Sequence, residues 1–163
     1  MRGTLTEVPA IFRAVLHAFE LAQEDIRRWC VPLTKTDWNA RPFGLPSVAF
    51  HIRHIIGSLD RLLTYAEGRE LTSEQLAALR TEIDLEEEPD PLMQELDAAI
   101  KRSSQRIHSF FASNLEESRF VGKKRLPATL AGLLIHLADH TQRHVGQAIT
   151  TAKVLVVLAE TRS

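Results

Sequence analysis

Apolar residues recur every three or four positions through four long segments of the chain. These segments cover residues 8–29, 47–68, 92–111 and 127–153. In a helix of 3.6 residues per turn, such spacing gathers the apolar side chains into one stripe. The stripes are buried when the helices pack against one another, so the pattern predicts an all-α protein built as a four-helix bundle.

Two of the connecting stretches are long enough to cross the bundle. Residues 31–46 contain three prolines and a glycine and are expected to form a loop across one end, held in place by Trp38 and Phe43. Residues 69–91 are polar and acidic, with a short helix predicted at 73–81. The fold class is therefore predicted to be a four-helix bundle with long crossover connections.

The C-terminal part of the chain contains two further signals. Pro127 is expected to open the last helix, because proline is tolerated in a first helical turn. The apolar segment 153–158 is expected either to lengthen that helix or to pack as an extended arm. Neither an internal repeat nor a second domain is visible, so residues 1–163 are expected to form one domain.

The composition and hydropathy of the sequence argue against several classes of function. Of the 163 residues, 44% are hydrophobic and 25% charged, and the net charge of −1 gives no basic surface for nucleic acid. The apolar runs are shorter than the ~18 residues of a membrane span, and the N-terminus lacks a signal-peptide pattern, so a cytoplasmic protein without membrane contact is expected. The single cysteine, Cys30, has no partner for an internal disulfide and is expected to be a packing residue.

Histidines are concentrated on two of the predicted helices. His136, His140 and His144 are each four residues apart, which places them within about 80° of one another on the last helix. We expect this row to lie on the inward face, where neutral imidazoles present nitrogen lone pairs, and neutral imidazole is the commonest metal ligand. His51 and His54 are three residues apart on the second helix, so both can point to one side.

A metal site in a helix bundle draws its ligands from facing helices, which makes His54, His140 and His144 the candidate set. Three imidazoles leave a coordination position open for water, as in catalytic sites. The simpler alternative is that these histidines are hydrogen-bonded residues of a core or an interface. Further candidates for lining a pocket or orienting a ligand are His51, His136, Asp139 and Gln147.

Two other metal motifs do not fit. A carboxylate-bridged di-iron bundle needs Glu-x-x-His on two helices, yet no glutamate stands three residues before any of the five histidines. A zincin needs His-Glu-x-x-His, but Thr141 follows His140. Peptidase chemistry of the zincin kind is therefore not expected.

The motifs SVAFHIRHI at 47–55 and HLADHTQRHVGQ at 136–147 resemble those of the DinB-like four-helix bundle metalloproteins. The resemblance covers nearly the whole chain. It implies a metal triad of one histidine from the second helix and an H-x-x-x-H pair from the last, here His54, His140 and His144. The extra histidine His51 leaves the choice between His51 and His54 open.

The resemblance also implies a divalent metal ion, zinc or nickel, and frequent homodimers. Characterised relatives carry out metal-dependent transfer reactions that involve low-molecular-weight thiols. The expected function is thus a metal-dependent thiol transferase or hydrolase that activates a thiol or water and acts on a small-molecule substrate. The alternative is a non-catalytic dimeric helical bundle that binds a metal or a small ligand.

Overall fold

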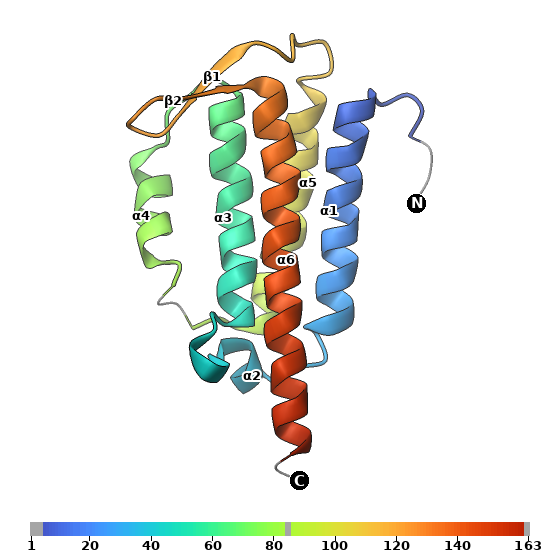
Figure 1. The fold of residues 1–163 in the computed structure, drawn as a ribbon, viewed down its shortest axis with the longest axis vertical. Coiled ribbons are helices and arrows are strands. Elements are labelled where there is room, and N and C mark those ends of the chain that lie inside the picture. Colours follow the sequence, from blue (N-terminus) through green and yellow to red (C-terminus); the bar gives the residue numbers. More distant parts are fainter. Residues whose placement is uncertain (1–4, 84–85, 162–163) are drawn as a thin grey trace.

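A computed structural model describes residues 5–83 and 86–161 of the chain and shows a bundle of four long helices (Figure 1). They are α1 (Ala10–Trp29), α3 (Val48–Ala66), α5 (Pro89–His108) and α6 (Leu130–Glu160). The predicted all-α four-helix bundle is confirmed. A helix that crosses a membrane would need a longer apolar stretch than any helix within the described residues provides.

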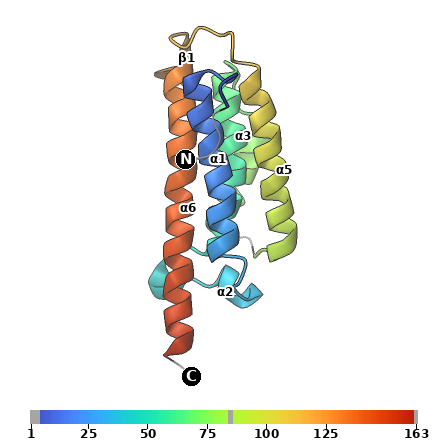
Figure 2. The same cartoon turned by 90° about the vertical axis from the view of Figure 1, so that its right-hand side faces the viewer.

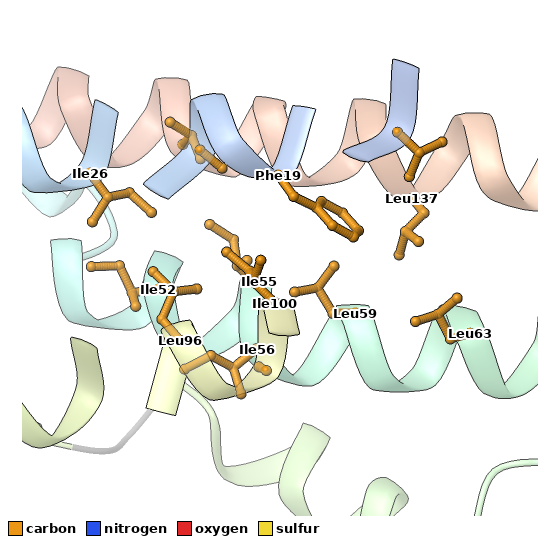
Figure 3. Packing of buried hydrophobic residues seen from close by; sticks show 14 of the residues in the cluster. Phe19, Ile26, Ile52, Ile55, Ile56, Leu59, Leu63, Leu96, Ile100 and Leu137 are labelled. Atoms are coloured by element: carbon orange, nitrogen blue, oxygen red, sulfur yellow. The ribbon is translucent and has the colours of Figure 1, made fainter. Parts of the chain in front are cut away.

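The four helices enclose one core. Helix α6 packs against both α1 and α3, and α3 packs in turn against α5 (Figures 1 and 2). Figure 3 shows side chains from all four helices meeting in this core, among them Phe19, Leu59, Ile100 and Leu137. Burial of one such side chain stabilises the fold by about 1.5–3 kcal/mol, so the core fixes α3 and α6 side by side.

The loop at 31–46 contains two short helices, α2 (Lys35–Asn39) and the 3-10 helix η1 (Pro42–Gly44). Trp38 is fully buried and donates a hydrogen bond from its indole nitrogen to the carbonyl oxygen of Cys30 at 2.9 Å, so its predicted anchoring role is confirmed. The same prediction for Phe43 is wrong, because 82% of its surface is exposed. Phe43 has a φ of 53°, and this turn directs its side chain into solvent rather than into the bundle.

Cys30 lies in the core beside this loop, as predicted for a packing residue. Its surface is fully buried, and burial raises the pKa of its thiol to about 12. A thiol with so high a pKa carries almost no thiolate at neutral pH, and the thiolate is the reactive form. Cys30 therefore contributes packing and no nucleophile.

Helix α3 and the crossover follow the sequence prediction. Ser47 caps α3, accepting a hydrogen bond from the backbone N–H of Phe50 at 3.1 Å. The short helix of the crossover is α4 (Ser73–Thr81), capped by Thr72. It lies alongside α3 (Figure 1), and its Gln75 donates a hydrogen bond to Thr64 of α3 at 2.9 Å. The crossover is thereby docked on the outer side of α3.

The start of the last helix differs from the prediction. Pro127 does not open it, because a hairpin of β1 (Ser118–Val121) and β2 (Leu126–Thr129) occupies this part of the chain, with Pro127 opposite Phe120. Gly122 has a φ of 67°, a backbone conformation that suits glycine and turns the chain back on itself. Thr129 then caps α6. The last helix therefore begins three residues after the proline.

Helix α6 continues through residues 153–158 to Glu160, which decides between the two alternatives for the apolar segment. Its C-terminal end projects beyond the other three long helices (Figures 1 and 2). There Val156 and Val157 are 46% and 56% exposed. The segment lengthens the helix and presents apolar side chains outside the bundle.

Candidate metal centre

Three histidines meet where α3 and α6 lie side by side. His54 projects from α3, and His140 and His144 project from successive turns of α6. Each offers one ring nitrogen, and the three nitrogens lie within 4.8 Å of one another. The ring centroid of His54 lies 5.1 Å from that of His140 and 4.3 Å from that of His144. Two facing helices thus bring together the three histidines singled out in the sequence.

The environment keeps the two imidazoles of α6 uncharged. Burial, followed by the neighbouring imidazoles, lowers the pKa of His140 to about 4, and burial and His54 lower that of His144 to about 4. Both rings are therefore neutral at pH 7, and each has a nitrogen lone pair. Neutral rings with lone pairs directed at one point are the form in which histidine binds a metal ion.

His51 lies behind this group and does not belong to it. Its side chain is buried, with 2% of the residue exposed, and its Nδ1 lies 3.1 Å from Nδ1 of His144. Because a hydrogen bond needs one donor and one acceptor, only one of these two nitrogens carries a proton. His51 therefore holds the ring of His144 in place, and the imidazole that α3 brings to the cluster is that of His54.

Glu82, directly after α4, was not singled out in the sequence. Its Oε2 lies 2.7 Å from Nδ1 of His54, its carboxylate forms an ion pair with Arg61 of α3, and only 4% of the residue is exposed. Burial raises the pKa of Glu82, but the hydrogen bonds with His54 and Arg61 outweigh this effect and leave it below its usual range. A buried carboxylate thus faces the outer nitrogen of a candidate ligand.

The sequence contained one indirect signal for Glu82. Gly57 interrupts the α3 pattern three residues after His54 and four before Arg61, and an isolated glycine in a helix often marks a close approach. A β-carbon at Gly57 would overlap both the Glu82 carboxylate and the Arg61 guanidinium. Nothing in the sequence, however, distinguishes Glu82 from the acidic residues that follow it.

Comparison with known proteins places the chain in a family. The sequence model of the DinB superfamily matches residues 18–148. The chain belongs to the DinB superfamily. No curated protein and no solved structure gives a significant match to it. For this DinB-superfamily protein, the helical fold and the cluster of three histidines both fit metal binding.

The remaining candidate residues of this DinB-superfamily protein lie outside the cluster. His136 is exposed and contacts His140 edge-on, with ring centroids 5.4 Å apart. Asp139 is exposed and forms an ion pair with Arg143, and Gln147 is also exposed. The expectation that the whole histidine row faces inward is therefore wrong.

The physical reason is the position of the row around the helix. Each histidine stands one residue before a buried residue of α6, namely Leu137, Thr141 or Val145. One residue corresponds to about 100° of rotation, so the row is turned away from the buried face that these residues form. The histidines lie at the margin of this face, toward solvent.

The cluster fits a metal ion on two grounds. Nδ1 of His140 is buried and finds no hydrogen-bond partner among the described residues, and an unpaired buried polar atom costs about 1–3 kcal/mol. The side chain of His54 is 18% exposed, so solvent reaches this ring of the cluster. Together with His54, the neutral rings of His140 and His144 offer three nitrogens without a complete set of protein partners, and such a group is suited to a divalent ion with an open position.

Proposed function

We propose that this protein is a metal-dependent enzyme in which His54, His140 and His144 bind one divalent ion. The observation that carries the proposal is the convergence of their three ring nitrogens within 4.8 Å. Within the described residues, the group contains no carboxylate or thiolate. Three protein ligands are typical of catalytic zinc sites, whereas structural sites are closed by a fourth.

The neighbours of the ligands indicate which nitrogens bind. Nδ1 of His54 faces Glu82 and Nδ1 of His144 faces His51, which leaves Nε2 of both rings for the ion. Metal-bound histidines commonly use one nitrogen for the ion and hold a hydrogen-bond partner with the other. Imidazole donors suit zinc and nickel, and we propose one of these two as the natural metal.

The proposed chemistry is thiol transfer or hydrolysis on a small-molecule substrate, with a low-molecular-weight thiol as the candidate co-substrate. A divalent ion at such a site supplies Lewis acidity and lowers the pKa of a thiol or water toward neutrality. The chain itself keeps His140 and His144 neutral, and it orients His54 and His144 through Glu82 and His51. The ring of Phe50 stacks on that of His54, with centroids 5.7 Å apart, and covers one side of the ligand.

Elemental analysis of tag-free protein tests the site. We expect about one zinc or nickel ion per chain, and none in the variant His140→Ala/His144→Ala, because one imidazole alone binds a divalent ion weakly. His136→Ala is the matched control, since it removes an exposed histidine from the same helix and should keep the metal. A metal-free wild-type protein after exposure to both ions would contradict the proposal. Metal binding without turnover in thiol-transfer and hydrolysis assays would favour the non-catalytic alternative.

We further propose that the protein forms a homodimer through the projecting end of α6. Val156 and Val157 expose apolar surface there, and burial of such surface against a second copy drives association. Light scattering should give twice the mass of one chain for the wild type and the mass of one chain for Val156→Glu/Val157→Glu. Leu21→Glu, an exposed apolar residue of α1, serves as the control that should stay dimeric. A monomeric wild type would exclude the dimer.

A further inference from the structure

We propose that Glu82 is a positioning residue of the metal site, one that selects the ring form of His54 able to bind the ion. This inference rests on the proposed function. It assigns a role to the crossover between α3 and α5, because Glu82 follows α4 and belongs to neither of the helices that carry the histidines. Its carboxylate accepts the N–H of Nδ1, which leaves the lone pair on Nε2.

At this position the carboxylate of Glu82 can only accept a hydrogen bond from the imidazole ring of His54. A neutral imidazole has its proton on Nδ1 or on Nε2, and an ionised carboxylate only accepts hydrogen bonds. With Oε2 of Glu82 at 2.7 Å from Nδ1 of His54, the proton is held on Nδ1. A carboxylate behind a metal-bound histidine orients the ring and raises its basicity as a ligand.

Arg61 explains why the carboxylate stays charged and in place. Its guanidinium contacts both oxygens of Glu82, and both side chains are less than 10% exposed. Because a guanidinium only donates hydrogen bonds, the group that faces Arg61 must present an acceptor to it. A carboxylate presents a second acceptor to Nδ1 of His54, whereas an amide in the same place would present its NH₂ there.

Gly57 supplies the space for this arrangement. The carboxylate and the guanidinium pass over the backbone of α3 where a β-carbon would overlap both. In the interior of an α-helix, glycine costs about 1 kcal/mol relative to alanine. The chain therefore gives up helix stability at the one position of α3 where the Arg61–Glu82 pair lies against the backbone.

The substitution Glu82→Gln tests the selection of the ring form. The new amide must turn its oxygen toward Arg61, which leaves its NH₂ facing Nδ1 of His54. The ring then accepts at Nδ1 and carries its proton on Nε2, the nitrogen needed for the metal. We expect zinc affinity to fall by about 10- to 100-fold, and ¹⁵N NMR of the metal-free protein should show the proton of His54 moving from Nδ1 to Nε2.

Two further variants separate this role from a purely structural one. Arg61→Met in the Glu82→Gln background frees the amide to turn its oxygen toward His54, so zinc affinity and the Nδ1–H form should partly recover. Gly57→Ala displaces the pair without removing a charge, and should weaken zinc binding while helix content is retained. Glu87→Gln is the matched control, since Glu87 pairs with Arg53 of α3 and does not contact the histidines.

The readouts distinguish this inference from the proposed function. If Glu82→Gln binds zinc like the wild type and His54 keeps its Nδ1 proton, the positioning role is wrong while the metal site stands. If the wild type binds neither zinc nor nickel but the proton of His54 moves as expected, Glu82 still selects the ring form and the metal site is wrong. An equal loss of zinc affinity in Glu87→Gln would also overturn the inference.

Discussion

Zinc added to the metal-free protein is expected to raise its melting temperature by about 10 °C. An ion that binds only the folded state stabilises it by about 4 kcal/mol at a thousand times its dissociation constant. For a domain of this size, 1 kcal/mol corresponds to about 2–4 °C. The effect is large because the three imidazoles converge only in the folded chain, where α3 and α6 lie side by side.

Differential scanning fluorimetry with a zinc titration, followed by excess chelator, measures this shift. The variant His140→Ala/His144→Ala should melt at the same temperature with and without zinc, whereas His136→Ala should respond like the wild type. An equal shift in all three proteins would mean that zinc binds elsewhere. Absence of a shift in the wild type would contradict a metal site at the cluster.

The metal-free protein is expected to lose stability steeply as the pH falls from 6.5 to 4.5. Burial and neighbouring imidazoles lower the pKa of His51 and His140 to about 4, and burial and His54 lower that of His144 similarly. Below pH 6.5 the unfolded chain binds a proton at each of these residues, whereas the folded chain binds them only near pH 4. Protonation therefore favours the unfolded state throughout this window.

The slope of the free energy of unfolding against pH follows from the number of protons taken up on unfolding. One proton changes the free energy of unfolding by about 1.4 kcal/mol per pH unit, so three imidazoles give about 4 kcal/mol per pH unit. Glu67 and Glu82 have lowered pKa values, and their stabilisation is lost only as the pH falls below about 4.5. The window from 6.5 to 4.5 thus reports on the histidines.

Urea unfolding at several pH values measures this slope, and His51→Asn provides the control. The asparagine oxygen can accept the hydrogen bond from Nδ1 of His144, but the side chain does not titrate. The variant should take up about two protons on unfolding instead of about three. A pH-independent stability of the wild type between 7 and 5 would show that the folded protein binds these protons as readily as the unfolded chain.

Much of this arrangement follows from local patterns in the sequence. The spacing of three and four predicted all four long helices, and the short helix at 73–81 was placed correctly. Each of these features depends on residues within one or two helical turns of one another. The histidines His54, His140 and His144 were also found this way, because each group repeats with the period of a single helix.

The incorrect predictions concern residues whose local sequence is compatible with more than one structure. Pro127 suits a first helical turn and also a strand of a two-stranded hairpin, and the turn at Gly122 decided between them. Phe43 is as apolar as Trp38, yet only Trp38 reaches the core. Which of two apolar side chains is buried depends on how the loop meets the end of the bundle.

By itself, the sequence determined the helices, their apolar faces and the two helices that carry the histidines, because these properties repeat with the period of the backbone. The tertiary structure alone decided that His54 rather than His51 meets His140 and His144, since that depends on the relative rotation of α3 and α6. It also decided the place of Glu82, one of many acidic residues in the crossover. Docking of α4 on α3 buries this carboxylate against His54, and no local pattern encodes a contact between residues 28 positions apart.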